Sequence, residues 1–63
     1  MKLVDMKPGM HVILTLPDGY KMRAQVGRIF EENAIRIICR FDNDGMMFVT
    51  EKNAKFFEEE LLN

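Results

Sequence analysis

The sequence predicts a small, mainly all-β protein built as one antiparallel meander. Three turn signals recur along the 63 residues, at 17–19, 31–33 and 42–45, and each supplies a Gly or Asn suited to a tight hairpin turn. The runs between these turns are short and rich in β-forming side chains, which is typical of antiparallel strands joined by hairpins. We therefore expect an SH3-like antiparallel β-barrel, or a strongly bent meander of four or five strands, with a short C-terminal helix.

The whole chain, 1–63, is expected to form one domain, because it is too short for two. Residues 1–9 lead into the first strand, residues 10–50 hold four strands, and residues 51–63 form an acidic C-terminal segment. In that segment Ala54, Phe57 and Leu61 share one helical face. We expect a helix over residues 51–62, with a short closing strand near residues 55–57 as the alternative.

Cross-strand pairing predicts a register in which one face of the sheet is apolar throughout. The first hairpin places Val12 beside Ala24 on this inner face. The second hairpin sets Ile29 opposite Ile35, but its simple continuation would bring polar residues into the core. One extra residue in the second strand repairs the pattern, and Gly27 stands where that β-bulge is needed.

The same register places an arginine-rich, partly apolar surface on the outer face. Arg23 is expected opposite Arg40 and Arg28 opposite Arg36, although like charges in such positions destabilise a sheet. Arginine, methionine and exposed apolar side chains together are typical of interfaces. The candidate partner-binding residues are Arg23, Arg28, Arg36, Arg40, Ile13, Ile38, Met47, Val49, His11 and Gln25.

Charge is distributed unevenly along the chain. Nine basic and ten acidic residues give a net charge of −1, yet residues 20–40 hold most of the arginines and residues 41–63 hold six acidic residues. Two interpretations of the basic face stay open. Either the acidic run 58–60 neutralises it, within the chain or from a neighbouring copy, or an external acidic or amphipathic partner binds there.

The residue inventory argues against catalysis and against a metal site. One cysteine and one histidine exclude an intrachain disulfide and a cluster of His and Cys metal ligands. Residues 42–45 resemble the start of a calcium loop but lack its downstream glutamate, so we interpret them as a hairpin turn. His11 has no matched acid or nucleophile, and Cys39 is expected in the core, opposite Phe48, where a thiol is inert. We expect no enzyme, no cofactor and no metal.

The function expected from this face is protein binding, as a small adaptor or regulator. The alternative is binding of RNA or single-stranded DNA, which is less well supported because the predicted outer face offers no aromatic side chain for base stacking. A small ligand or a pure assembly role is a third possibility.

A homodimer is also expected, because so short a chain has little surplus stability. Its interface would use the apolar outer residues, with Phe56 and Leu62 contributing from the tail. The first residues lack the apolar stretch of a signal peptide, and a free cysteine suits a reducing compartment, so we expect a cytoplasmic protein with no membrane span.

Overall fold

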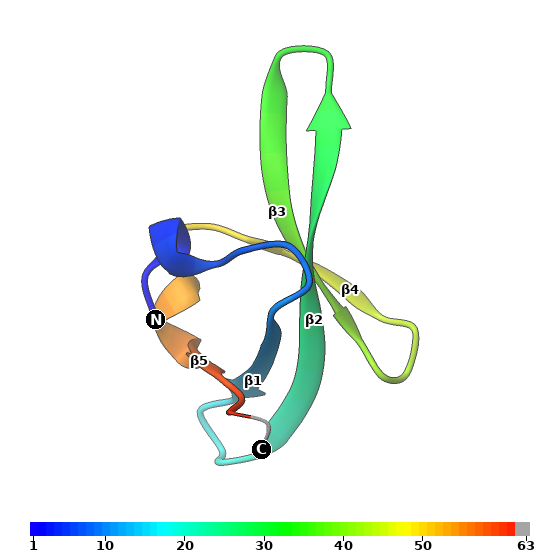
Figure 1. The fold of residues 1–63 in the computed structure, drawn as a ribbon. Coiled ribbons are helices and arrows are strands. Elements are labelled where there is room, and N and C mark those ends of the chain that lie inside the picture. The colour runs from blue at the N-terminus through cyan, green and yellow to red at the C-terminus, as the bar shows by residue number, and fades with distance from the viewer. Residues whose placement is uncertain (62–63) are drawn as a thin grey trace.

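The computed structural model describes residues 1–61 and forms one antiparallel sheet of five strands (Figure 1). The strand order is β4-β3-β2-β1-β5, so the sheet is a meander whose last strand returns beside the first. The all-β expectation is confirmed, and the sheet is not closed into a barrel. The elements are η1 (Leu3–Asp5), β1 (His11–Thr15), β2 (Lys21–Glu31), β3 (Ala34–Phe41), β4 (Met46–Val49), η2 (Ala54–Phe56) and β5 (Phe57–Glu59), where η marks a 3₁₀ turn.

The predicted C-terminal helix is wrong. Within residues 1–61 the segment after β4 makes the single 3₁₀ turn η2 and then the strand β5, which pairs antiparallel with β1. The Asn53 side chain holds the preceding turn, since it accepts from Thr50 N–H at 2.7 Å and donates to Phe48 C=O at 3.1 Å. Strand alternation then turns Phe57 inward, where it is buried. Leu62, part of the expected helix and interface, lies outside the described residues.

The first hairpin has the predicted register, from His11 opposite Gln25 to Thr15 opposite Lys21. The second hairpin does not. Its strands pair without interruption, and Ile35 lies opposite Phe30 instead of Ile29. The predicted bulge at Gly27 is therefore wrong.

A two-residue turn explains this regular second hairpin. Glu31 pairs with Ala34, which leaves only Glu32 and Asn33 in the turn, the loop length that hairpins favour. This register already sets Val26 opposite Cys39, so the inner face stays apolar over the core without an extra residue, and Arg28 is turned to the inner side beyond the core.

The third hairpin is also displaced by one residue from the prediction. Cys39 pairs with Met47, and Phe48 pairs with Ile38. The turn closes with Asp44 in the left-handed region at φ 67°, and Phe41 N–H donates to Gly45 C=O at 2.8 Å. As a result Phe48 lies on the outer face and Val49 faces the core, the reverse of the expected arrangement.

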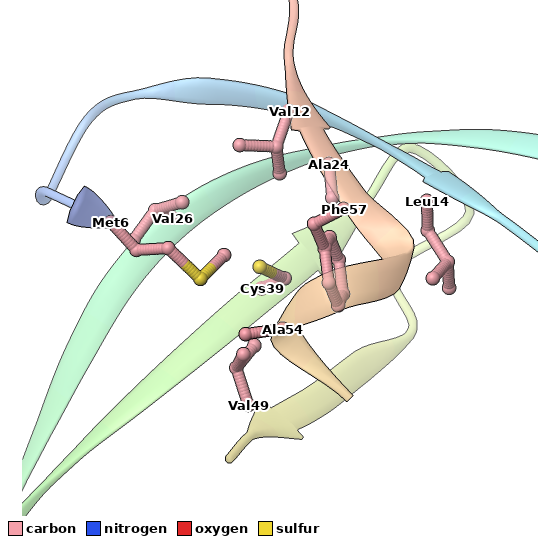
Figure 2. Close-up of a cluster of buried hydrophobic side chains, with 9 residues drawn as sticks. All are labelled: Met6, Val12, Leu14, Ala24, Val26, Cys39, Val49, Ala54 and Phe57. Carbon is pink, nitrogen blue, oxygen red and sulfur yellow. The ribbon is translucent and has the colours of Figure 1, made fainter. Parts of the chain in front are cut away.

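The core lies on the inner face of the sheet and is covered by both ends of the chain. Met6 enters it just after η1, and Phe57 enters it from β5; Figure 2 shows the Phe57 ring pointing into the middle of the cluster. The N-terminal ammonium group donates to the carbonyl groups of Ala54 and Phe57, which joins the two ends. The buried cluster is Met6, Val12, Leu14, Ala24, Val26, Cys39, Val49, Ala54 and Phe57.

The β2–β3 hairpin extends beyond this core as a projecting ribbon (Figure 1). Strand β1 reaches along β2 only as far as Gln25, and β4 reaches along β3 only as far as Ile37. Residues 28–37 therefore form a two-stranded segment that extends past its neighbours in the sheet, which we call the arm.

We expect Gly27→Ala to stabilise the protein. A Cβ at this position would lie 3.6 Å from Ile38 Cγ1, an ordinary van der Waals contact. Alanine in a strand interior restricts the unfolded chain more than glycine does, and the gain should be about 0.5–1 kcal/mol. Urea denaturation measures this change in the free energy of unfolding. A loss of stability would indicate a bulge at Gly27 after all.

The Cys39 thiol should make stability decrease at alkaline pH. Its side chain is fully buried, and burial raises the pKa of the thiol from 9.0 to about 11. Above pH 9 the unfolded thiol ionises while the folded thiol keeps its proton, so stability is lost as the pH rises from 9 toward 11. The advantage in unfolding free energy of the wild type over Cys39→Ala should therefore shrink across this window. A constant difference would contradict the assignment.

Candidate functional site

The outer face of the sheet carries the candidate site, but its side chains are arranged differently from the prediction. Arg40 lies opposite Gln25 instead of Arg23, and Arg28 lies opposite Ile37 instead of Arg36. Neither predicted Arg–Arg pair forms, because the second hairpin is shifted in register. The cross-strand rows of this face run Glu58–Ile13–Arg23, His11–Gln25–Arg40–Met46, Gly27–Ile38–Phe48 and Ile29–Arg36.

At the β1–β5 end of this face, the acidic tail neutralises the basic side chains. Arg23 Nε donates to Glu60 Oε2 at 2.8 Å, and the Glu60 side chain is only 12% exposed. Lys21 Nζ lies 3.6 Å from Glu58 Oε1, with both side chains largely exposed. Ile13 is half-buried between Arg23 and Glu58 in the same row. This end is therefore paired within the chain and offers little net charge to a partner.

The middle of the face is polar and open. His11, Arg40 and Glu60 line a hollow of about 420 Å³, and Gln25 Nε2 donates to Gly9 C=O at 3.3 Å. Within the described residues, Arg40 makes no ion pair within 4.0 Å. The imidazole of His11 has no hydrogen-bond partner in this part of the chain that would make it a general base.

At the β3–β4 end, an apolar hollow of about 140 Å³ opens on the outer face. We call it the apolar hollow, and its lining residues are Ile29, Ile38, Met46, Met47 and Phe48. Ile38 is only 4% exposed, whereas Met46 and Phe48 at the sheet edge are 60% and 49% exposed. Met46 and Phe48 therefore expose apolar surface on an edge strand, where exposed apolar side chains favour association with a partner.

Arginine borders this hollow. The Arg36 guanidinium lies 5.6 Å from the centre of the Phe48 ring, within the range of a cation–π interaction. Its Nε also donates to Glu31 Oε2 at 2.9 Å, so the side chain is held in place over the aromatic ring. The arrangement combines an apolar contact surface with the oriented guanidinium group of Arg36, which is suited to an amphipathic ligand.

The predicted site residues thus separate into three groups. Arg23, Arg36, Arg40, His11 and Gln25 are exposed on the outer face as expected. Two apolar residues expected to be exposed are buried, because Ile38 is covered by its outer-face neighbours and Val49 faces the core. Arg28 and Met47, both expected on the outer face, lie on the inner side, where Met47 pairs with Cys39 and packs against the core. Ile13 is half-buried on the outer face.

Sequence reasoning missed Ile29, Met46 and Phe48. The register error placed Ile29 and Phe48 on the inner face, so no aromatic side chain was expected outside. A two-residue turn at Glu32 and Asn33 is the signal that assigns Ile29 to the outer face. Phe48 reaches the outer face because the third hairpin pairs it with Ile38 instead of Cys39.

Residues 1–61 contain neither a cluster of metal-binding side chains nor a membrane-spanning helix. No group of three or more His, Cys, Asp or Glu side chains in this range is placed to hold a metal ion. No helix in the same range is long and apolar enough to cross a membrane.

We expect Arg23→Thr to destabilise the protein, whereas Arg40→Thr should leave its stability almost unchanged. Of these two arginines, only Arg23 has an acidic partner among residues 1–61, and the Arg23–Glu60 pair is partly exposed, so its loss should cost about 1 kcal/mol or less. Glu60→Gln should reproduce the effect, and high salt should reduce it. Thermal unfolding of the three variants tests this. Equal stability of Arg23→Thr and the wild type at low salt would refute a stabilising pair.

The chain was also compared with known proteins. No model of a protein family, no curated protein and no solved structure matches it. Any functional assignment therefore depends on the geometry and chemistry of the outer face.

Proposed function

We propose that this protein is a non-catalytic binding module that holds an amphipathic segment of another protein against its outer face. The observation that carries the proposal is the apolar hollow, with Met46 and Phe48 exposed beside the buried Ile38. Aromatic, methionine and arginine side chains are enriched where protein partners bind.

The charges around the hollow indicate what the partner carries. Arg40 has no acidic partner among the described residues, and Arg36 pairs with one glutamate, Glu31. A segment with one or two apolar side chains for the hollow and a carboxylate for Arg40 would fit. The charge pair would mainly set orientation and association rate, while the apolar contact would supply most of the affinity.

The connectivity supports a module of SH3-like type. A four-stranded meander is followed by the 3₁₀ turn η2, and β5 then returns beside β1. This assignment concerns architecture, and the proposed activity depends on the surface residues, since one fold supports many functions.

Nucleic acid is the second candidate, and one observation favours it. Phe48 lies on the outer face beside Arg36, so an aromatic side chain is available for base stacking. Against it, the same face carries Glu31 and Glu60, both within salt-bridge distance of arginines. These carboxylates would repel a phosphate backbone, and we therefore rank protein binding first.

Affinity capture with matched surface variants tests the proposal. We expect the wild type to retain one or more proteins from its host extract, and the double variant Met46→Thr with Phe48→Thr to lose them, because the apolar contacts are gone. Tyr20→Thr is the control, since Tyr20 is an exposed aromatic that is not part of the hollow. Thermal unfolding verifies that each variant is folded, and purified partner is then titrated by calorimetry.

Two outcomes would contradict protein binding at this site, and a third would contradict the role of Arg40. Proteins retained equally by the double variant would place the site elsewhere. Loss of the captured proteins after nuclease treatment would indicate nucleic acid, as would an affinity that falls steeply and linearly on a log–log plot against salt. Unchanged affinity in Arg40→Glu, a variant that leaves the apolar hollow intact, would remove the proposed role of that arginine.

A further inference from the structure

The sheet has two free edges, β4 and β5, because it is not closed into a barrel (Figure 1). A free edge presents unpaired backbone N–H and C=O groups, to which a strand of another chain can bond. Folded proteins usually protect such an edge with charged side chains or with a covering segment. The two edges of this sheet differ in that protection.

The β5 edge is protected by charge and by the N-terminal end of the chain. Glu60 N–H donates to His11 C=O at 2.8 Å, so alternation turns the backbone groups of Phe57 and Glu59 away from β1, toward the free edge. The N-terminal ammonium group donates to Phe57 C=O, and the Glu59 side chain is exposed. An incoming strand would have to displace the ammonium group and lie beside an acidic run.

The β4 edge lacks this protection by charge. The strand Met46–Val49 contains no charged residue. Its ladder with β3 begins at the turn, where Phe41 N–H donates to Gly45 C=O at 2.8 Å. Hydrogen-bonded and non-hydrogen-bonded positions alternate from there. Met47 therefore bonds to β3, while the backbone groups of Met46 and Phe48 point to the free edge.

Most of these outward backbone groups are free. Asn53 Nδ2 donates to Phe48 C=O at 3.1 Å, as expected of a carbonyl group that does not bond to β3. By the same alternation, and with no other bond from residues 1–61, the N–H and C=O of Met46 and the N–H of Phe48 have no partner. The β4 edge thus offers donors and an acceptor at the spacing of a strand.

The side chains of the same two residues line the apolar hollow. Met46 is 60% exposed and Phe48 is 49% exposed. A strand laid along β4 would continue the cross-strand rows of the outer face. Its residue beside Phe48 would join the row of Ile38, and its residue beside Met46 would join the row of Arg40. An apolar side chain and a carboxylate two positions apart match these rows.

We propose that the partner binds β4 as an extended segment that adds one antiparallel strand to the sheet. The inference rests on the proposed function and specifies how the partner is held. Backbone hydrogen bonds to Met46 and Phe48 would supply affinity, and alternate side chains over the outer face would supply specificity. The antiparallel direction continues the pairing of the whole sheet and gives the more stable ladder. The segment therefore has an apolar residue, then any residue, then an acidic residue.

Charge distinguishes this partner from a second copy of the chain. Antiparallel pairing of two β4 strands over residues 46–48 would continue the row of Arg40 through Phe48 and Ile38 of the second copy, neither of which is acidic. Arg40 makes no ion pair within residues 1–61. It lies two strand spacings, about 10 Å, from the added residue, a distance that an arginine and a glutamate bridge together. The expected occupant is therefore a segment of a different protein that carries a carboxylate.

Amide hydrogen exchange, followed by NMR on the full chain, tests the free edge. In the protein alone the amides of Met46 and Phe48 should exchange rapidly and that of Met47 slowly, because only Met47 bonds to β3. The probe is a blocked peptide whose central residues are leucine, threonine and glutamate, in that order, between flanking threonines. Saturation with this peptide should slow exchange at Met46 and Phe48 about tenfold or more.

N-methylation of the peptide tests the backbone contact separately from the side chains. A methyl group on the glutamate nitrogen removes the N–H that donates to Met46 C=O and should weaken binding about tenfold or more. A methyl group on the central threonine nitrogen is the matched control, since that N–H points away from β4, and it should leave the affinity almost unchanged. A peptide with the leucine and glutamate exchanged should bind more weakly, and equal affinity would overturn the antiparallel direction.

Each contrary result has a separate meaning. Slow exchange at Met46 and Phe48 in the dilute protein would overturn the free edge. Protection of these amides that grows with protein concentration, without peptide, would identify a second copy as the occupant. Equal affinity of the two methylated peptides, with binding that Met46→Thr with Phe48→Thr abolishes, would overturn strand addition and leave the proposed function intact. Absence of peptide binding at millimolar concentration would also overturn strand addition, whereas the capture experiment decides the proposed function by itself.

Discussion

A single sheet leaves one face of every strand to be covered, and in this chain the two ends of the sequence provide the cover. Phe57 enters the core from β5, and Met6 enters it from the lead-in segment. The N-terminal ammonium group donates to the carbonyl group of Phe57, so the two covering segments hold each other in place. Burying Phe57 requires β5 to lie beside β1, and this pairing brings Glu60 to Arg23. Part of the outer surface thus follows from how the inner face is closed.

The turn at Glu32 and Asn33 decides which residues reach the outer face. The strands and the first register could be predicted from sequence, because Pro17-Asp18-Gly19 defines its hairpin clearly and β1 alternates cleanly. Strand β3 does not alternate cleanly, since residues 37–39 are apolar at odd and even positions alike. A shift of one residue between two strands moves the side chains of one strand to the other face, and apolar patterning could not choose between the registers. The second hairpin thus exchanges the faces of Arg28 and Ile29, and the third exchanges those of Phe48 and Val49.

The remaining errors have related physical causes. Ala54 and Phe57 are spaced for a helical face and both are buried, but one 3₁₀ turn followed by an extended strand buries them while adding backbone hydrogen bonds to β1. Tertiary burial overrides a weak local preference in such cases. For the candidate site, composition identified the exposed arginines, whereas Phe48 was lost through the register error. Ile38 was expected to be exposed, yet the apolar side chains lining the hollow cover it from the outer side.

The length of the β2–β3 hairpin connects the two surfaces that the structure leaves uncovered. Along β2, Ile29 lines the apolar hollow while the next residue, Phe30, faces the opposite side of the arm. Along β3, Arg36 over the Phe48 ring alternates in the same way with Ile35. The arm therefore presents Ile29 and Arg36 on the side of the apolar hollow and Phe30 and Ile35 on the opposite side, so that one hairpin forms part of both uncovered surfaces.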